Sequence, residues 1–254
     1  SPRVISGAFL QTGQTMSNPT IFMPAYDEGH HNKNFEKEMG RLSKSKIFED
    51  LSTVIITPTR GTLHVRHVCA MAGLIRPFNH RIHGPIYPRG LEVGEAYNTV
   101  IQQILDNPQL GDFKYVLTVE DDMLPPLDGM LRLFRNIGDY DAIGGLYWTK
   151  GENGLPLMFG DTSKDENYIP VLPIPGTVQP VYGSGMGFNL WKLDMFRQIE
   201  PPWFETVAKV EGEYAVTMTQ DIHFFKKANK LGFKFAIDTT CRCGHMNVSD
   251  ESVW

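Results

Sequence analysis

Short apolar runs alternate with amphipathic stretches between residues 53 and 147 of this 254-residue chain. Runs rich in β-branched residues and bounded by turn residues predict strands, whereas apolar positions at helical spacing predict helices. The predicted strands are 53–57, 78–83, 115–119 and 141–147, and the predicted helices are 64–74, 91–105 and 127–137. This order is typical of a parallel sheet with crossover helices. We therefore expect an α/β protein with a single, mainly parallel, Rossmann-like sheet flanked by helices.

The pattern is less regular on either side of this alternation. Residues 1–50 are irregular apart from a short helix predicted at 35–43. The later part holds a Gly- and Pro-rich stretch at 151–180, a glycine-rich segment at 183–187, helices at 191–198 and 221–231, and a strand at 233–237. No repeat or composition break divides this part from the alternating part. We expect an N-terminal extension of unclear structure (1–50) and one domain (51–254).

The strand predicted at 115–119 ends at three consecutive carboxylates, Glu120, Asp121 and Asp122, and Pro125-Pro126 prevents its continuation. Adjacent carboxylates repel one another, but a hard divalent cation takes carboxylate oxygens together with substrate phosphates. The carboxyl ends of strands in open α/β sheets are also where ligands bind. The triplet is therefore a candidate metal and phosphate site, and a solvated acidic turn is the alternative.

The first strand ends in a polar loop, Pro58-Thr59-Arg60, at the same expected edge of the sheet. Arg60 is suited to hold a phosphate or a base edge there. The alternative is a surface arginine after a turn. The shared edge favours the functional interpretation.

The strand followed by Glu120-Asp121-Asp122 resembles the aspartate-x-aspartate motif of glycosyltransferases with the A-type fold, most closely the family-2-like group. These enzymes use nucleotide-diphospho-sugar donors. Over residues 53–245 the other matching segments occur in the expected order: Val54 to Arg60, Gly94 to Asn98, Gly183 to Phe188, Trp191 to Phe196, Gln220 to Phe225, and Cys243 to His245. The chain departs from the pattern where Tyr97 replaces an arginine, Glu120 an aspartate and Gln220 a glutamate.

The resemblance implies a nucleotide-binding half (51–147), an acceptor-binding half (148–254) and a Mn²⁺ or Mg²⁺ ion. Asp122 would be a direct metal ligand, Glu120 would act through water, and His245 would add a neutral imidazole. Asp121 would reach ribose or sugar hydroxyls. The residues implied on the donor side are Pro58, Thr59, Arg60, Asn98, Glu120, Asp121 and Asp122.

Asp221 is the candidate general base, because an acceptor hydroxyl that attacks the anomeric carbon must lose its proton. The reaction would then invert the anomeric configuration. Asp221 also lies where a helix N-cap is expected, so capping is the alternative role.

The candidate acceptor site comprises Gly183, Ser184 and Gly185 of the glycine-rich segment together with Trp203. The glycines form either an anion cradle of exposed amides or a bulged strand turn. Trp203 and Phe204 are suited to an aromatic platform for a sugar face, and core packing is the alternative for Phe204. The segment 151–180 is too long for a simple connection and is predicted to border the acceptor pocket as a mobile loop.

Two rival interpretations of the function stay open. One is a nucleotidyltransferase-like enzyme, although Thr59-Arg60-Gly61-Thr62 is a poor version of the required signature. The other is a non-catalytic domain that binds nucleotide-sugars. A zinc site at Cys241-x-Cys243-x-His245 is disfavoured, because the spacing is too tight and a fourth ligand is missing.

Composition indicates the partners and compartment of the protein more than its reaction. A net charge of -5 argues against non-specific nucleic-acid binding, and three cysteines favour a reducing, cytoplasmic compartment. No apolar run approaches the roughly 18 residues of a transmembrane span. The acceptor is not readable: a glycan, a protein, a lipid-linked sugar or a small molecule fits, and modified nucleic acid fits less well.

Overall fold

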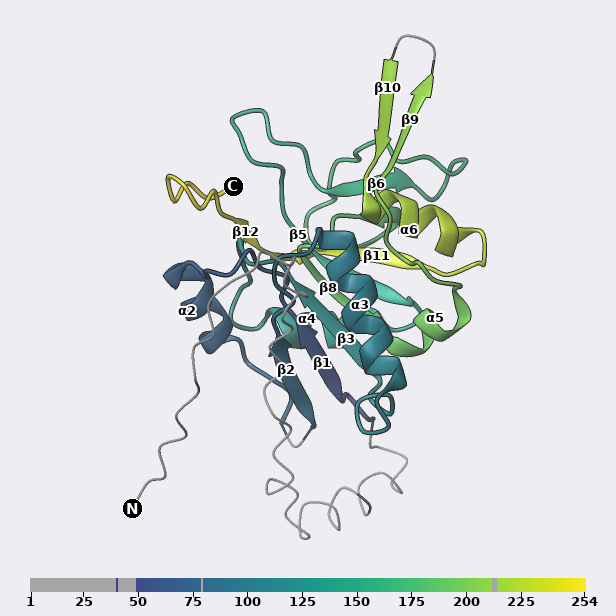
Figure 1. Cartoon of the computed structure of the whole chain (residues 1–254). Coiled ribbons are helices and arrows are strands. Elements are labelled where there is room, and N and C mark those ends of the chain that lie inside the picture. The colour runs from purple at the N-terminus through teal and green to yellow at the C-terminus, as the bar shows by residue number, and fades with distance from the viewer. Residues whose placement is uncertain (1–39, 41–48, 79, 212–213) are drawn as a thin grey trace, which may run out of the picture.

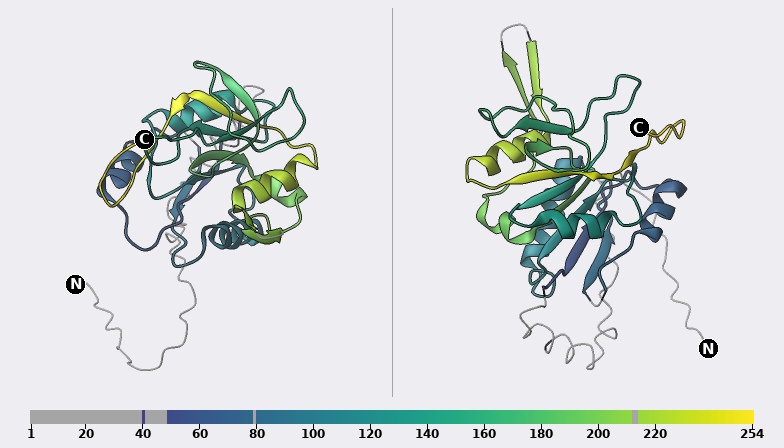
Figure 2. Two further views of the ribbon diagram at one scale, coloured as in Figure 1. Left: turned by 90° about the horizontal axis from the view of Figure 1, so that it is seen from above. Right: turned by 180° about the vertical axis from the view of Figure 1, so that it is seen from behind.

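The computed structural model describes residues 40, 49–78, 80–211 and 214–254 of the chain (Figure 1). Apart from Gly40, the helix predicted at 35–43 lies outside the described residues, as does almost all of the predicted N-terminal extension. The structure is an α/β arrangement with a large sheet flanked by helices (Figures 1 and 2).

The sheet has eight strands in the order β2-β1-β3-β8-β5-β11-β7-β6. Their bounds are β1 Thr53–Ile56, β2 Ile82–Ile86, β3 Tyr115–Val119, β5 Ala142–Leu146, β6 Met158–Asp161, β7 Val178–Ser184, β8 Phe188–Lys192 and β11 Phe235–Arg242. β1 is parallel to β2 and β3, and β5 is parallel to β11. β8 is antiparallel to both β3 and β5, and β7 is antiparallel to β11 and β6. The expectation of a mainly parallel sheet is therefore wrong, because the sheet is mixed.

The unexpected strand β8 has a simple cause. The apolar residues from Phe188 to Phe196 suit both a fully buried strand and a helix, so the helix predicted at 191–198 starts too early. The structure places Trp191 in the strand and begins the helix at Leu193. Because β8 lies between β3 and β5, it separates the two halves that a continuous parallel order would have joined.

Five helices are described: α2 Val65–Gly73, α3 Val93–Asp106, α4 Gly129–Ile137, α5 Leu193–Gln198 and α6 Gln220–Asn229. α3, α5 and α6 pack on one face of the sheet, and α2 and α4 pack on the other. The division follows the alternation of β1, whose Val54 and Ile56 belong to the first core while Ile55 belongs to the second. The right-hand view of Figure 2 shows α4 on the face opposite α3.

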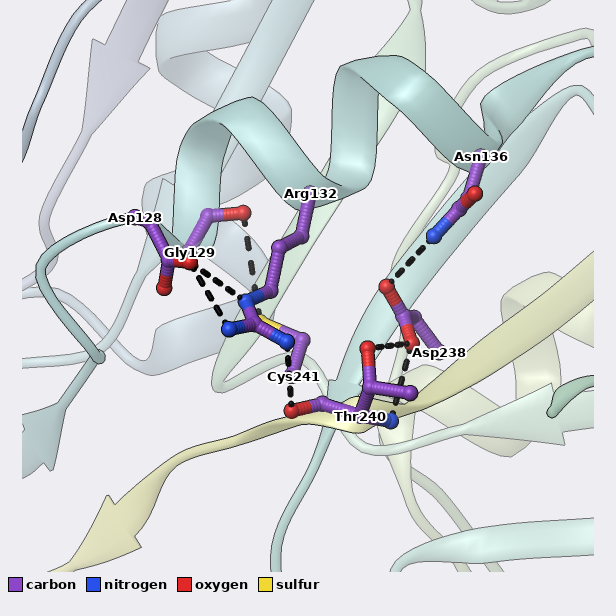
Figure 3. Close-up of polar contacts among 7 residues, drawn as sticks. All are labelled: Asp128, Gly129, Arg132, Asn136, Asp238, Thr240 and Cys241. Atoms are coloured by element: carbon purple, nitrogen blue, oxygen red, sulfur yellow. Dashed lines mark hydrogen bonds and ion pairs between the residues drawn. The ribbon is translucent and has the colours of Figure 1, made fainter. Parts of the chain in front are cut away.

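A polar network joins α4 to β11 across the second face (Figure 3). The Asn136 amide donates to Asp238 at 2.8 Å, and Arg132 bonds both Asp128 and the carbonyl of Thr240. Cys241 is buried with its Sγ 3.9 Å from the carbonyl oxygen of Gly129. This cysteine behaves as a packed core residue.

Two short pairings complete the fold. β9 Val207–Glu211 and β10 Tyr214–Met218 form an antiparallel hairpin that projects from the body (Figure 1). β4 Met123–Leu124 pairs with β12 Gly244–His245. Within the described part of the chain, none of the helices has the length and apolar character to cross a membrane.

Several predicted boundaries move in the structure. The strand predicted at 78–83 is β2, which begins only at Ile82, and Phe78 lies outside it with 91% of its surface exposed. The strand predicted at 233–237 is β11 and continues to Arg242. The segment 151–180 adds edge strand β6 and the start of β7, so part of it belongs to the sheet instead of a separate loop.

Trp203 lies in the core, where only 2% of its surface is exposed. Its indole Nε1 donates to the carbonyl oxygens of Phe196 and Ile199 at 3.1 and 2.9 Å. The Asn98 amide is committed nearby: Oδ1 accepts from the backbone N–H groups of Trp203 and Phe204, and Nδ2 donates to the Phe204 carbonyl. The sugar platform predicted for Trp203 and the donor contact predicted for Asn98 are therefore wrong in this structure, because both side chains are used by the fold.

Replacing Trp203 with alanine should lower the free energy of unfolding by about 3–5 kcal/mol, the usual loss for a buried aromatic residue. Trp203→Phe, which keeps most of the packing but loses two hydrogen bonds, should lose less. Chemical denaturation followed by circular dichroism measures both. A Trp203→Ala protein of unchanged stability would contradict the structural role.

Candidate functional site

A pocket of about 370 Å³ opens at the carboxyl ends of β1 and β3. It is lined by Pro58, Thr59, Arg60, Leu91, Glu92, Val93, Glu120, Asp121 and Asp122. Six of the seven predicted donor-side residues therefore lie together, and Asn98 is the exception. The volume is within the range of small-molecule sites.

Sequence reasoning missed the contribution of the α3 start to this pocket. Glu92 is the N-cap of α3, and its Oε2 accepts from the backbone N–H groups of Gly94 and Glu95 at 2.8 and 3.2 Å. Such a cap satisfies helix N–H groups that have no intrahelical partner. The signal that could have identified Glu92 is an acidic residue at the start of an amphipathic helix, at the same edge of the sheet.

Asp122 and His245 meet because β12 pairs with β4. In that register His245 lies opposite Met123, and the Met246 N–H donates to the Asp122 carbonyl at 2.9 Å. The His245 Nε2 is 3.4 Å from Asp122 Oδ2. Two positions more than a hundred residues apart in the chain thus contribute to one site.

The orientation of the His245 ring restricts its chemistry. Nδ1 lies 2.7 Å from the Trp148 carbonyl, which can only accept, so Nδ1 carries the hydrogen. In the neutral ring Nε2 then carries a lone pair that faces the Asp122 carboxylate, whereas in the charged ring Nε2 donates to it. A cation held between the carboxylate and the neutral ring would serve both acceptors. A ring held by a carbonyl at one nitrogen is the usual arrangement of a metal-binding histidine.

The two oxygens of the Asp122 carboxylate have different surroundings. Its Oδ1 is buried without a hydrogen-bond partner among the residues that the structure describes. Lys150 Nζ pairs with Oδ2 on the other side. Burial acts to raise the pKa of Asp122, but hydrogen bonds from His245 and Lys150, together with their charges, outweigh it and lower the pKa.

Lys150 is the main charged residue of the site that the sequence analysis missed. It follows β5, whose carboxyl end lies at the same edge as those of β1 and β3. The edge rule that selected Arg60 applies equally to a lysine just after the strand predicted at 141–147.

The three predicted metal ligands do not assemble into one group. In the described part of the chain, no three His, Cys, Asp or Glu side chains are placed to hold a metal ion. Asp122 and His245 nevertheless fit such an ion, since a carboxylate oxygen and an imidazole nitrogen suit Mn²⁺ and can be completed by phosphate or water oxygens. Glu120 does not join them.

Glu120 lies in a different electrostatic setting. Burial, followed by the negative charges of Asp122, Asp221 and Asp121, raises the pKa of Glu120 to about 8. Its backbone N–H donates to the Gly187 carbonyl at 2.9 Å, which ties the acidic turn to the strand β8 side. Glu120 therefore holds a proton near neutral pH in the ligand-free protein.

Asp221 lies in the first turn of α6 and is near enough to act on the charge of Glu120. The N-cap of this helix is Thr219, so Asp221 does not occupy the capping position that was the alternative to a role as base. Asp221 Oδ1 accepts from the Ile222 N–H at 2.8 Å and from the Thr219 hydroxyl. Burial raises the pKa of Asp221, and these hydrogen bonds partly offset the rise.

The glycine-rich segment is used by the core. Gly183, Ser184 and Gly185 are all buried. A Cβ atom on Gly183 would lie 3.0 Å from the Phe225 ring, and one on Gly185 would lie 2.3 Å from the Tyr147 hydroxyl. The Gly185 and Gly187 N–H groups are already bonded to the Leu157 carbonyl and the Tyr147 hydroxyl. Of the two interpretations of these glycines, the structure therefore favours the strand turn over the anion cradle, because the three acceptor-site residues at 183–185 are buried.

Comparisons with known proteins support the fold and stop there. The chain is similar to a solved structure of A197 from STIV, with 14% identity, a TM-score of 0.55, and coverage of 80% of this chain and 92% of that one. It is also similar to S. aureus TarS 1–349, with 11% identity and a TM-score of 0.43, over 76% of this chain and 59% of that one. No protein-family model matches the sequence, and no curated protein matches it either. At these identities the first similarity shows a shared fold, and the second is too weak to carry an argument.

The raised pKa of Glu120 predicts a pH-dependent stability. Between the ordinary value of 4.5 and about 8, the folded protein keeps a proton that the unfolded chain has released. This stabilisation is complete below 4.5 and is lost as pH rises through about 8. Glu120→Gln has no proton to lose, so its melting temperature should exceed that of the wild type increasingly from about pH 5 to about pH 8.

The measurement is thermal unfolding in chelator, and Glu95→Gln, which removes an exposed glutamate in the first turn of α3, is the control. The control should show a difference that changes little with pH. A constant difference for Glu120→Gln across this range would show that the carboxyl group is not protonated in the folded protein.

Proposed function

We propose that this protein is a metal-dependent glycosyltransferase that moves a sugar from a nucleotide-diphosphate donor to an acceptor hydroxyl. The observation that carries the proposal is the pairing of Asp122 with His245, with Asp122 Oδ1 buried and without a partner among the described residues, beside a pocket lined by the acidic triplet and the Pro58–Arg60 loop. Supporting this, the segment resembles the aspartate-x-aspartate motif, and the pocket lies at the strand edge where α/β sheets bind ligands.

Asp122 and His245 are the residues that would hold the ion. A divalent cation there would neutralise the charge that develops on a leaving nucleoside diphosphate without any proton transfer. Arg60 lines the same pocket and would attract the phosphates from the β1 side. Asp121, which also lines it, would accept hydrogen bonds from ribose or sugar hydroxyls.

Lys150 adds a role that the sequence analysis did not foresee. Its ammonium group neutralises Asp122 in the ligand-free protein. With a divalent cation held by Asp122, the Lys150 ammonium group would be free to pair with a phosphate oxygen of the donor. The lysine thereby keeps the site from carrying uncompensated negative charge before the donor binds.

Asp221 is the proposed base. Burial raises its pKa above that of an ordinary aspartate, which strengthens it as a proton acceptor once it is ionised. The short first turn of α6 fixes its position through the Ile222 N–H. A base that removes the acceptor proton on the side opposite the leaving group gives inversion of the anomeric configuration.

The non-catalytic alternative, a domain that binds nucleotide-sugars without turnover, has one observation in its favour. Lys150 already occupies Asp122 as a cation would. The two functions differ in a donor screen that records both binding and released nucleoside diphosphate. Binding without release in the presence of Mn²⁺ and a broad set of acceptors would support the alternative.

Release of nucleoside diphosphate should require Mn²⁺ or Mg²⁺ and should collapse in Asp122→Ala. His245→Ala should weaken Mn²⁺ binding less than Asp122→Ala, because a neutral imidazole brings no charge to the ion. Isothermal titration with Mn²⁺ and nucleoside diphosphate measures this order independently of turnover. Asp106→Ala, which removes an exposed aspartate at the end of α3, is the matched control. Full turnover in excess chelator would overturn the metal requirement.

Asp221→Asn should keep donor binding and lower turnover by about 10² or more, the usual scale for loss of a general base. The acid limb of the pH profile of kcat/KM should lie above that of an ordinary aspartate, because burial raises the pKa of Asp221 and only the ionised form accepts a proton.

Thr219→Val provides a sharper version of the same test. The Thr219 hydroxyl lowers the pKa of Asp221, and Thr219 makes no side-chain cap bond to α6 that the change would remove. The variant should therefore move the acid limb to higher pH without unfolding the helix. An unmoved limb, or a product that retains the anomeric configuration, would exclude Asp221 as the base.

A further inference from the structure

The outer surface of α2 is apolar, which is unusual for a helix at the edge of a fold. Val65 and Val68 lie on its exposed side, and Ile75 and Phe78 follow in the segment after its last residue, Gly73. Leu127 lies beside this end of α2: its carbonyl accepts from the Ile75 N–H at 2.7 Å. These five side chains are between 45% and 91% exposed. We call this surface, formed by Val65, Val68, Ile75, Phe78 and Leu127, the α2 face.

The α2 face is not needed to build the core. The opposite side of the same helix already supplies His67 and Met71 to the interior. A helix with one buried side normally shows polar residues on the other. A group of exposed apolar side chains therefore indicates a surface that is covered when it functions.

Two exposed arginines accompany the α2 face: Arg66 lies within α2, and Arg76 follows Ile75 directly. They belong to a segment, 51–91, that contains five arginines, no lysine and neither aspartate nor glutamate, in a chain whose net charge is -5. The nearby Glu251 is engaged at its rim, where its carboxylate lies 3.3 Å from His64 and its carbonyl accepts from Arg66.

This combination identifies the class of partner. Arginines attract phosphate-bearing anionic lipids, while valine, isoleucine, leucine and phenylalanine side chains enter the boundary between headgroups and acyl chains. A nucleic acid would use the arginines but would leave the five apolar side chains uncovered. We propose that the α2 face is a docking surface for an anionic lipid bilayer.

The position of the α2 face connects docking with the pocket. α2 begins shortly after Pro58, Thr59 and Arg60, which line the pocket at the end of β1. A bilayer against α2 would thus lie beside the opening at the carboxyl edge of the sheet. Binding itself does not depend on the proposed transferase activity, so it is tested without turnover.

The test is sedimentation of the full chain with vesicles. Wild-type protein should bind phosphatidylcholine vesicles that contain phosphatidylserine, bind pure phosphatidylcholine much more weakly, and dissociate from the former as salt is raised. Val68→Ser with Phe78→Ser should reduce the partition coefficient about tenfold or more, because two exposed apolar anchors are removed. Arg76→Gln should weaken binding only to the anionic vesicles.

Ile169→Ser with Leu172→Ser removes two apolar side chains that are equally exposed but lie outside the α2 face, so it is the matched control and should bind normally. All of these positions are exposed, and unchanged melting temperatures would verify that the variants are folded. Lack of binding to anionic vesicles by wild-type protein would overturn the proposal, as would equal loss in the control. A concentration-dependent dimer that Val68→Ser with Phe78→Ser abolishes would overturn it in favour of a second copy of the chain.

Discussion

The need to gather several carboxylates at one edge of the sheet is the constraint on which the site depends. Glu120, Asp121, Asp122 and Asp221 are close enough for the charges of the other three to raise the pKa of Glu120. Like charges in a half-buried recess repel strongly, and the protein relieves this repulsion in two ways. Glu120 keeps a proton, whereas Asp122 stays ionised against Lys150 and His245.

Two features of the fold keep Asp122 ionised. The pairing of β12 with β4 brings His245 opposite the acidic turn, and the Trp148 carbonyl fixes which ring nitrogen faces Asp122. Lys150, two residues after Trp148, adds a positive charge that pairs with the Asp122 carboxylate. A ligand that brought its own cation would compete with Lys150 for Asp122, so the proposed metal would be expected to bind more tightly together with the proposed donor than alone.

Much of the fold could be predicted from periodicity, because β1, β3, β5 and helices α3, α4 and α6 combine strong patterns with clear ends. The mixed order of the sheet could not. β8 is apolar on both faces and runs directly into α5, so its residues satisfy the strand and helix patterns at once. Pairing direction is a long-range property that one strand does not encode, and the insertion of β8 between β3 and β5 depends on packing from both cores.

Some residues of the site could also be predicted from the sequence, and others could not. Residues at strand ends, such as Arg60 and Asp122, were predictable because topology alone sends them to one edge. Asn98, Trp203 and the glycines at 183 and 185 were not, since the same residue types serve ligands or cores and only burial distinguishes the two. Trp203 illustrates this most clearly: an exposed indole after two prolines suits a sugar, yet its Nε1 bonds two backbone carbonyls in the interior.

The uneven distribution of charge along the chain links the two surfaces proposed above. With no acidic residue from 51 to 91, the positive charge of this segment is not cancelled locally, and the acidic triplet faces it across the pocket. A diphosphate needs positive charge on the protein, whereas the metal ion that accompanies it needs negative charge. Because the positive and negative side chains follow different strands at one edge of the sheet, the pocket would offer positive charge to a diphosphate and negative charge to a metal ion. Arg60 at the strand end and Arg66 and Arg76 at the α2 face come from the same segment, so one compositional bias would attract a phosphate donor at the pocket and an anionic lipid surface at the adjoining helix. Docking on the α2 face would place the opening of the pocket beside the lipid surface.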